Sequence, residues 1–310
     1  MYYLSADVGG TFTDLVLIDT NAGRAHVDKV PSAERGSAAS IVKGLDRIVE
    51  KAGLERSHVD LFVHGFTVGT NAFLMRTGAR VVMVLTDGFR DVLEIGDQLR
   101  PELYSLQQNK PVPVVPRSRI LEIAERIDSF GEVVQEISDD DIARVIDDIA
   151  ALEPEAISVC LNFSFVNDVH ERKLGEALRQ KFTDIPVYLS CDVNPEIEEY
   201  PRTNTTAIAG YLGPIIDKYL RHLEKDLQDS GVTAPLRLMR SDGGMSTPRA
   251  ARTNPATMML SGPAGGVIAS AYLGQRLEIE NLVTFDMGGT SADFSTIVGG
   301  SPKKVNSRSI

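Results

Sequence analysis

The sequence has little cysteine and no apolar run long enough to cross a membrane. Its two cysteines, Cys160 and Cys191, lie 31 residues apart and form no C-x-x-C or Cys/His ligand spacing. This excludes a disulfide framework and a structural zinc site. Nowhere do about 18 apolar residues follow one another, and the first residues lack the basic and apolar regions of a signal peptide. We therefore expect a protein of the reducing cytoplasm with no membrane span.

Positive charge is also in short supply. The chain has 32 Lys and Arg against 43 Asp and Glu, which gives a formal net charge of -11. No basic field is available to hold a nucleic-acid backbone or an anionic membrane, so both are excluded as partners. We expect small molecules or other proteins as partners.

What the sequence does have is the composition of a folded protein, with 43% hydrophobic and 24% charged residues over 310 positions. This leaves room for about two domains. Short apolar or alternating runs predict strands. These runs lie at 2-7, 14-19, 25-30, 60-64, 81-85, 156-161, 186-190, 235-240 and 281-286.

Helical patterns lie between many of these strands. The clearest helix runs over 38-52 and ends at Gly53, and another begins at Ser138, whose hydroxyl is suited to cap the N–H of Asp141. Alternating strands and helices predict an α/β protein with a mixed sheet. The first three strands have no helix between them, so we expect an antiparallel meander there. Further helices are predicted at 169-181, 212-228 and 264-276, and a proline-rich excursion at 100-120.

A short motif occurs twice. Residues 7-14 read Asp-Val-Gly-Gly-Thr-Phe-Thr-Asp and residues 286-293 read Asp-Met-Gly-Gly-Thr-Ser-Ala-Asp, with five identities in eight. Each copy follows one predicted strand and precedes another, so each forms a tight hairpin with an Asp at the end of its first strand. A plain turn is the alternative reading for one copy. Two copies in matched contexts favour a binding function.

The chemistry of this motif suits phosphate. Paired glycines let successive backbone N–H groups point into one concavity, and hydroxyls add further donors. Asp7 and Asp286 are predicted to hold Mg²⁺ through water, which turns their repulsion of phosphate into attraction. These two aspartates are therefore our candidate catalytic and metal-binding residues. The candidate phosphate-binding residues are Gly9, Gly10, Thr11, Thr13, Gly288, Gly289, Thr290 and Ser291.

The order of several blocks resembles the hydantoinase A and 5-oxoprolinase family, within the superfamily of acetate and sugar kinases, heat-shock chaperones and actin. The resemblance extends over essentially the whole chain. The blocks that carry it are Asp7-Val-Gly-Gly-Thr-Phe-Thr-Asp14, His64-Gly-Phe-Thr-Val-Gly-Thr-Asn-Ala72, Gly88-Phe-Arg-Asp-Val-Leu-Glu-Ile-Gly96, Arg202-Thr-Asn-Thr-Thr206, Ser261-Gly-Pro-Ala-Gly-Gly266 and Asp286-Met-Gly-Gly-Thr-Ser-Ala-Asp293.

The resemblance implies an actin-like, ribonuclease H-like ATPase fold whose second lobe is truncated here. It implies an N-terminal domain over 1-185 with an inserted segment at about 97-135. It further implies the start of a second domain over 200-310, with a connecting helix at 262-276 and the first hairpin of the second lobe. Where the family usually has Thr, this chain has Phe66, so a hydroxyl expected near the cleft is missing.

The resemblance also implies a function. ATP with Mg²⁺ would phosphorylate a carbonyl oxygen of a hydantoin, N-methylhydantoin or 5-oxoproline, with a hydantoinase B-type subunit or a C-terminal region as the hydrolytic partner. A ketone carboxylase subunit, a small-molecule kinase and a non-catalytic nucleotide-binding module are the alternatives. The candidate substrate residues are Thr67, Asn71, Arg202 and Thr203. For the first two, helix capping alone is the alternative interpretation. For the last two, the alternative is a helix N-cap beside an exposed arginine.

Overall fold

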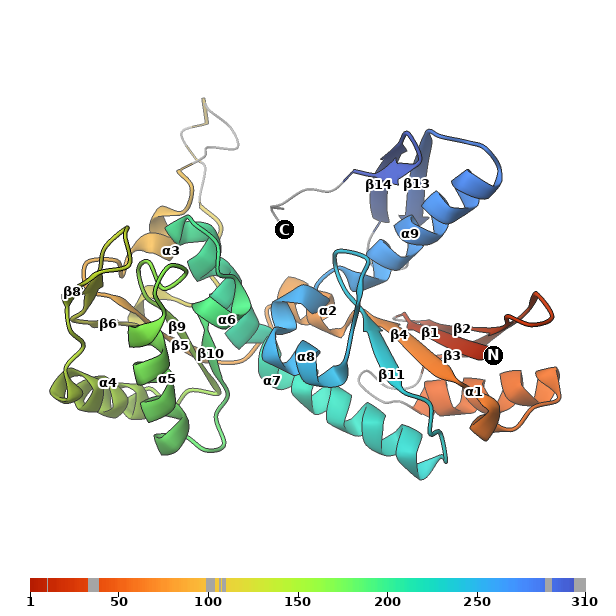
Figure 1. Cartoon of the computed structure of the whole chain (residues 1–310), viewed down its shortest axis with the longest axis horizontal. Helices are drawn as coiled ribbons and strands as arrows, with labels where there is room; N and C mark the ends of the chain where they lie inside the picture. The colour runs from red at the N-terminus through yellow and green to blue at the C-terminus, as the bar shows by residue number, and fades with distance from the viewer. Residues whose placement is uncertain are drawn as a thin grey trace. The chain divides into compact units, whose positions relative to one another are not determined.

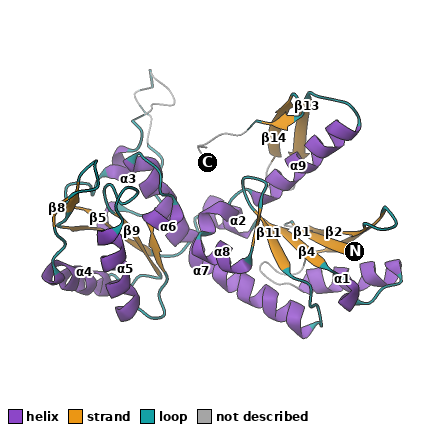
Figure 2. Cartoon of the chain, viewed as in Figure 1, coloured by secondary structure: helices purple, strands orange, loops and turns teal. Residues whose placement is uncertain are grey.

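The computed structural model describes residues 1–9, 11–32, 39–98, 104–105, 107, 110–287 and 292–303. Helices and strands alternate along this part of the chain (Figure 2), which confirms the α/β class. The chain divides into two compact units. Unit 1 comprises 1–74, 216–252 and 257–310, and unit 2 comprises 75–215 and 253–256. The division at 1-185 and 200-310 stays a prediction.

Unit 1 is built on a six-stranded mixed sheet with the order β12-β11-β4-β1-β2-β3. The first three strands pair antiparallel, as the sequence predicts, and β4 and β11 then join parallel to β1 and to one another. Helix α1 packs against β2 and β3 (Figure 1). The strands are β1 (Tyr2–Val8), β2 (Phe12–Asp19), β3 (Arg24–Pro31), β4 (Leu61–Phe66), β11 (Leu236–Met239) and β12 (Met245–Ser246).

The remaining elements of unit 1 follow or flank this sheet. A smaller antiparallel sheet has the order β13-β14-β15 and packs on helix α9. The elements are α1 (Ala39–Ala52), α2 (Val68–Leu74), α8 (Pro248–Thr253), α9 (Ser261–Arg276), β13 (Leu282–Met287), β14 (Ala292–Val298) and β15 (Ser301–Pro302), with short 3-10 turns at Arg56–His58 and Pro255–Met258.

Unit 2 contains a parallel sheet with the order β10-β9-β5-β6, and its strands are largely buried on both faces. Its apolar core lies between this sheet and helices α4 and α5. Ser138 accepts a hydrogen bond from the N–H of Asp141, so the predicted cap of α4 is confirmed. The elements are β5 (Val81–Thr86), α3 (Val92–Ile95), a 3-10 turn at Arg117–Arg119, β6 (Ile120–Ile123), β7 (Arg126–Ile127), β8 (Val133–Gln135), α4 (Asp139–Ala151), β9 (Ala156–Cys160), α5 (Val169–Lys181), β10 (Val187–Leu189) and α6 (Ser190–Val193).

One helix differs from the sequence expectation. Helix α7 (Glu199–Asp229) begins well before the predicted start at 212. Pro201 lies in its first turn, where the missing N–H has no intrahelical partner to lose, so this proline does not end the helix. The inserted segment at about 97-135 stays a prediction, and its strand β6, which begins where the proline-rich stretch at 100-120 ends, pairs with β5 in the main sheet of unit 2. Part of that segment lies outside the described residues.

No helix within the described ranges is both long and apolar enough to cross a bilayer.

Candidate functional site

Asp7 lies near the end of β1, where two neighbouring strands fix its surroundings. Across the hairpin it pairs with Asp14 of β2, and on its other side it aligns with Gly65 of the parallel strand β4. A Cβ on Gly65 would come within 3.3 Å of Asp7 Oδ1, so the glycine leaves room for the carboxylate. The turn closes through Gly9, whose N–H donates to the carbonyl of Phe12 at 3.0 Å. The predicted hairpin is therefore formed.

The Asp7 side chain is exposed, yet it sits in an unfavourable electrostatic environment. Partial desolvation by the surrounding protein raises the pKa of its carboxyl, and the negative charges of Asp14 and Asp286 raise it further. Like charges in one place favour the neutral acid unless a cation joins them. The negative charge of Asp286 thus raises the pKa of Asp7, as expected of two carboxylates that bind one cation together.

Hydroxyls of the first hairpin fall on two faces. Thr11 is exposed beside the turn, as a phosphate donor needs to be. Thr13 has no exposed surface, and its hydroxyl bonds Ser40 Oγ at 3.0 Å and Ser32 Oγ at 3.1 Å. This corrects the expectation for Thr13, because a buried and fully engaged hydroxyl braces the hairpin against α1 rather than facing a ligand. Gly10 lies outside the described residues.

The second hairpin repeats the first in register. Asp286 of β13 pairs with Asp293 of β14, as Asp7 pairs with Asp14. The duplication seen in the sequence is therefore also a duplication of strand pairing. The candidate phosphate residues Gly288, Gly289, Thr290 and Ser291 lie outside the described residues, so their role stays a prediction.

The turn from β4 into α2 lies at the same sheet edge as Asp7, because β1 and β4 run parallel. Thr67 and Asn71 are half-buried there, and Asn71 Nδ2 donates to Thr67 Oγ1 at 3.1 Å. The start of α9 docks on this turn, since Ser261 Oγ donates to the carbonyl of Phe66 at 3.1 Å and the N–H of Leu260 donates to Thr70 Oγ1 at 3.0 Å. The structure thus brings Asp7, Thr67 and Asn71 to one edge.

Phe66 has a different place from the one expected. It has no exposed surface and packs on the rings of His64 and Tyr219, with centroid separations of 5.5 and 5.2 Å. Phe66 therefore fills the core beneath the sheet edge. A threonine at this position would not have placed its hydroxyl in an open cleft. His64 is fully buried, as the packed reading of this residue predicts.

His64 is held in one tautomer. Its Nδ1–H donates to the carbonyl of Ala6 at 3.0 Å, and its Nε2 accepts from the hydroxyl of Tyr219 at 2.6 Å. Burial raises the pKa of Tyr219, which keeps that hydroxyl a donor. Burial lowers the pKa of His64 from 6.5 to about 4. The neutral imidazole thus links the residue before Asp7 to helix α7.

This burial predicts a pH-dependent stability. The unfolded chain takes up a proton at His64 near pH 6.5 and the folded chain only near pH 4, so stability is lost as the pH falls through that window. The full loss is on the order of 3 kcal/mol. We expect the free energy of unfolding of His64→Gln to vary less between pH 6.5 and 4 than that of the wild type. The exposed His222→Gln serves as the control, and equal slopes for wild type and His64→Gln would contradict the assignment.

Arg202 and Thr203 belong to unit 2 and are buried, with exposed fractions of 1% and 3%. Arg202 Nη1 donates to the carbonyl of Leu161 at 2.7 Å and to Ser164 Oγ at 2.6 Å, while Thr203 Oγ1 lies 3.3 Å from Cys160 Sγ. These contacts correct both readings from sequence, since the arginine is neither an exposed neighbour of an N-cap nor open to a substrate. Both residues serve the interior of unit 2 in this structure.

Sequence reasoning missed Arg240. This residue follows β11, which runs parallel to β4, so it reaches the same sheet edge as Thr67. It forms an ion pair with Asp242 at 3.0 Å, while its Nε is buried without a partner among the described residues. Arg240 therefore places a positive charge just after the carboxyl end of β11, the strand that neighbours β4. Only the strand order could have revealed Arg240 as a candidate. In the sequence 176 residues separate it from His64, although the two residues belong to neighbouring strands of the sheet or their ends.

Magnesium fits these residues if it is bound through water. The like charges that raise the pKa of Asp7 are what a divalent cation would neutralise. Across the described ranges, however, no group of three or more His, Cys, Asp or Glu side chains is arranged to hold a metal ion directly. Mg²⁺ keeps several of its waters in sites that also bind phosphate. A hydrated ion beside Asp7 is compatible with both observations.

The chain is similar to several known proteins. The alpha subunit of caprolactamase from Pseudomonas jessenii is 32% identical over 305 residues, which cover 96% of this chain and 44% of that subunit. A crystal structure of the ATP-dependent caprolactamase from the same organism matches with a TM-score of 0.84 and 31% identity, over 95% of this chain and 43% of that chain. A nucleotide-free structure of acetone carboxylase matches with a TM-score of 0.87 and 26% identity, over 97% and 45%.

The chain therefore spans less than half the length of these relatives. Their folds agree with the mixed α/β architecture and with the expected actin-like arrangement. A model of the hydantoinase/oxoprolinase N-terminal region matches residues 3–182, and a hydantoinase/oxoprolinase model matches residues 202–310. The chain belongs to the hydantoinase/oxoprolinase family.

Proposed function

We propose that this chain is the ATP-handling part of an enzyme that opens a cyclic amide of the hydantoin, N-methylhydantoin or 5-oxoproline type. The observation that carries the proposal is the pair of hairpins in one register, with Asp286 close enough to Asp7 to raise the pKa of its carboxyl. The similarity to the caprolactamase subunit supports the class of reaction.

In this proposal the protein contributes mainly position and charge. A hydrated Mg²⁺, when bound, supplies charge neutralisation for the transferring phosphoryl group. Asp7 and Asp286 hold that ion through water, while the N–H groups of the turns and the exposed hydroxyl of Thr11 orient phosphate oxygens. Arg240 adds a fixed positive charge at the same edge, where a phosphate oxygen gives it the partner that its Nε lacks.

The substrate carbonyl is assigned to the turn that bears Thr67 and Asn71. Their side chains already bond one another at 3.1 Å, so the pair presents a fixed group of donors and acceptors. Phosphorylating the carbonyl oxygen turns it into a leaving group and makes the carbonyl carbon open to attack by water. The hydrolytic step is assigned to a hydantoinase B-type partner subunit or to a further region of the protein.

A ketone carboxylase subunit is the second candidate. Acetone carboxylase matches this structure with a TM-score of 0.87, as well as the caprolactamase does. Both activities require activation of a carbonyl oxygen by ATP, so the hairpin site serves either one. The difference between them lies in the group that accepts the phosphoryl unit.

Calorimetric titration with Mg-ATP tests the proposal directly. We expect saturable binding that requires Mg²⁺, and absence of binding would overturn the phosphate role of the hairpins. Phosphate release is then measured with 5-oxoproline, hydantoin, caprolactam or acetone, each in turn. Release with a cyclic amide supports the hydrolase, release only with acetone supports the carboxylase, and transfer to a stable phosphorylated product supports a kinase instead.

A further inference from the structure

Unit 2 contains a pocket that the proposed function does not use. It has a volume of about 390 Å³ and lies beside the edge strand β6, with Asp87 and Arg90 from the segment after β5 and Arg144 from helix α4 on its walls. Ile120, Leu121, Glu122 and Ala124 complete the lining. Because the strands of this sheet are parallel, Asp87 and Ala124 follow carboxyl ends of neighbouring strands. Ligands of parallel α/β sheets bind outside such ends.

Two charged side chains of this pocket form no ion pair among the described residues, although the charge of Arg90 contributes to lowering the pKa of Asp91. Arg90 takes part in no ion pair among the residues that the structure describes, and its buried Nε has no hydrogen-bond acceptor there. Its one side-chain bond runs from Nη2 to the carbonyl of Arg117 at 3.3 Å. Asp87, which is exposed, forms no ion pair within the same described ranges. A buried N–H without a protein acceptor is satisfied by an ordered water or by a ligand.

The other two charged side chains of the pocket already have ion-pair or hydrogen-bond partners. Arg144 pairs with Asp141 at 3.2 Å and with Asp148 at 3.7 Å on its own helix. Glu122 Oε1 accepts from the N–H groups of Gly88 at 2.9 Å and of Arg90 at 3.2 Å, which pins the loop against β6. Among the described residues, the guanidinium of Arg90 and the carboxylates of Asp87 and Glu122 therefore form no ion pair, and Glu122 is held by backbone N–H donors.

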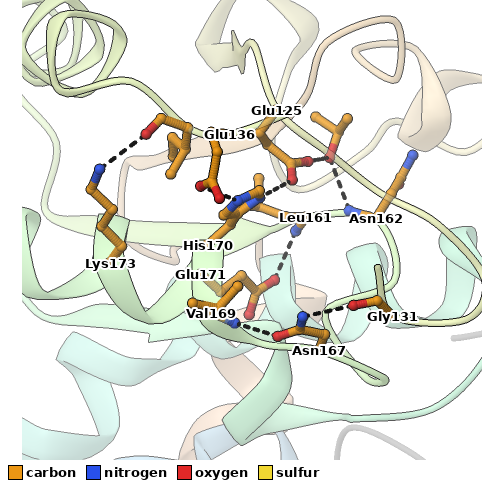
Figure 3. A network of polar contacts seen from close by, with 12 residues as sticks. Glu125, Gly131, Glu136, Leu161, Asn162, Asn167, Val169, His170, Glu171 and Lys173 are labelled. Carbon is orange, nitrogen blue, oxygen red and sulfur yellow. Dashed lines mark hydrogen bonds and ion pairs between the residues drawn. The ribbon is translucent and has the colours of Figure 1, made fainter. Parts of the chain in front are cut away.

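The wall of the pocket is rigid. Glu125, next to Ala124, accepts a hydrogen bond from Thr86, which precedes Asp87. Glu125 is also bonded to His170 of α5 at 2.7 Å, and Figure 3 shows this chain of contacts. Hydrogen bonds of the adjacent residues Thr86 and Glu125 therefore hold the strand ends that carry Asp87 and Ala124.

We propose that this pocket binds a small amino acid in its zwitterionic form. The guanidinium of Arg90 receives the carboxylate, and the carboxylate of Asp87 receives the ammonium group. The volume is at the lower end of the range for small-molecule sites, which suits a ligand of this size. The Gly88-Phe-Arg-Asp-Val-Leu-Glu-Ile-Gly96 block, which has no part in the phosphate site, thereby gains a role.

The ligand class also bears on the reaction. Hydrolysis of a lactam such as 5-oxoproline adds water across its C–N bond and leaves an amine and a carboxylate on one molecule, which is an amino acid, whereas a hydantoin leaves a carbamoylated nitrogen beside the carboxylate. The pocket would then hold the product, and this link alone rests on the proposed function. Binding at the pocket requires no nucleotide, so its failure and the failure of the ATP site are separately visible.

The test is a calorimetric titration of the chain without ATP, with three probes of matched length. We expect 6-aminohexanoate to bind saturably, and hexanoate and hexylammonium to bind roughly tenfold more weakly or less, since each has lost one charge-assisted contact. Equal binding of hexanoate would overturn the zwitterion assignment. Absence of saturable binding of 6-aminohexanoate would overturn the site.

Variants locate the site. Arg90→Gln is expected to reduce the affinity for 6-aminohexanoate to that for hexylammonium, and Asp87→Asn to reduce it to that for hexanoate. Arg90→Lys keeps the charge without the planar fork and provides a second variant if Arg90→Gln does not fold. Arg179→Gln, on the last turn of α5, is the matched control and should bind as the wild type does. Wild-type affinity in both Arg90→Gln and Asp87→Asn would contradict the proposal.

Discussion

Replacing Asp7 with Asn is expected to weaken Mg-ATP binding while it stabilises the protein without ligand. The pKa of this carboxyl is raised by desolvation and by Asp14 and Asp286, so the ionised group is unfavourable in the folded state at neutral pH. Removing the charge relieves that repulsion. It also removes the carboxylate that would hold the hydrated ion, and loss of an outer-sphere partner lowers metal affinity roughly 10- to 100-fold.

Calorimetry of Mg-ATP binding and thermal unfolding without ligand measure the two effects. The sign of the pH dependence checks the cause. Because the folded chain keeps its proton at Asp7 to higher pH than the unfolded chain does, the wild type loses stability as the pH rises above 3.8 through the raised pKa. Asp7→Asn removes this contribution.

Asp19→Asn is the matched control at the far end of the same hairpin. The carboxylate of Asp19 accepts from the N–H groups of Asn21 at 2.9 Å and of Ala22 at 3.1 Å, and these bonds lower its pKa. Its replacement should therefore destabilise slightly and leave Mg-ATP binding unchanged. If Asp7→Asn bound Mg-ATP as well as Asp19→Asn, the cation would not be held at Asp7.

Replacing Glu125 with Ala is expected to lower the free energy of unfolding of unit 2 by about 3 to 5 kcal/mol. The Glu125 side chain has no exposed surface and accepts from His170 Nδ1 at 2.7 Å and from the hydroxyl of Thr86. That hydroxyl accepts in turn from the N–H of Asn162 at 2.9 Å. The variant leaves a buried imidazole and a buried hydroxyl without their partner, which is the costly way to break such a network.

Glu136→Ala tests the same histidine from its other side. Glu136 contacts His170 Nε2 at 3.4 Å, but 80% of its side chain is exposed. Its loss should change the free energy of unfolding by at most about 1 kcal/mol. Urea denaturation followed by circular dichroism suits both variants, since the chain has no tryptophan to report unfolding. Equal losses for the two variants would show that burial of the Glu125 contact does not matter.

The sequence predicted the strands well because their signal is local. Apolar alternation placed all nine predicted strands close to their observed bounds, and the serine cap placed the start of α4. The start of α7 was missed because Pro201 is compatible with a first helical turn. Local pattern does not distinguish a proline that precedes a helix from one within its first turn.

The site was predicted in part, and the errors share a cause. Asp7 lies near the end of β1, and Thr67 and Asn71 lie after β4, so the parallel pairing of these strands brings the three residues to one end of the sheet, while their roles stay a prediction. Thr13 and Arg202 were placed at the ligand on residue type, although their direction depends on packing partners at Ser40 and Ser164. Arg240 was missed because strand order, which no local pattern encodes, brings β11 beside β4.

The two hairpins have the same strand register, but among the described residues only the first is tied to a neighbouring helix by a buried hydroxyl. Thr13 ties the first hairpin to α1 through Ser40, whereas the corresponding position of the second hairpin holds Ala292, which is exposed and has no hydroxyl. A phosphate chain that touches both would meet one hairpin tied to a neighbouring helix by a buried hydroxyl and one that lacks this hydroxyl. A hydroxyl introduced at position 292 would therefore offer a means of changing nucleotide affinity without altering a residue proposed to contact the nucleotide.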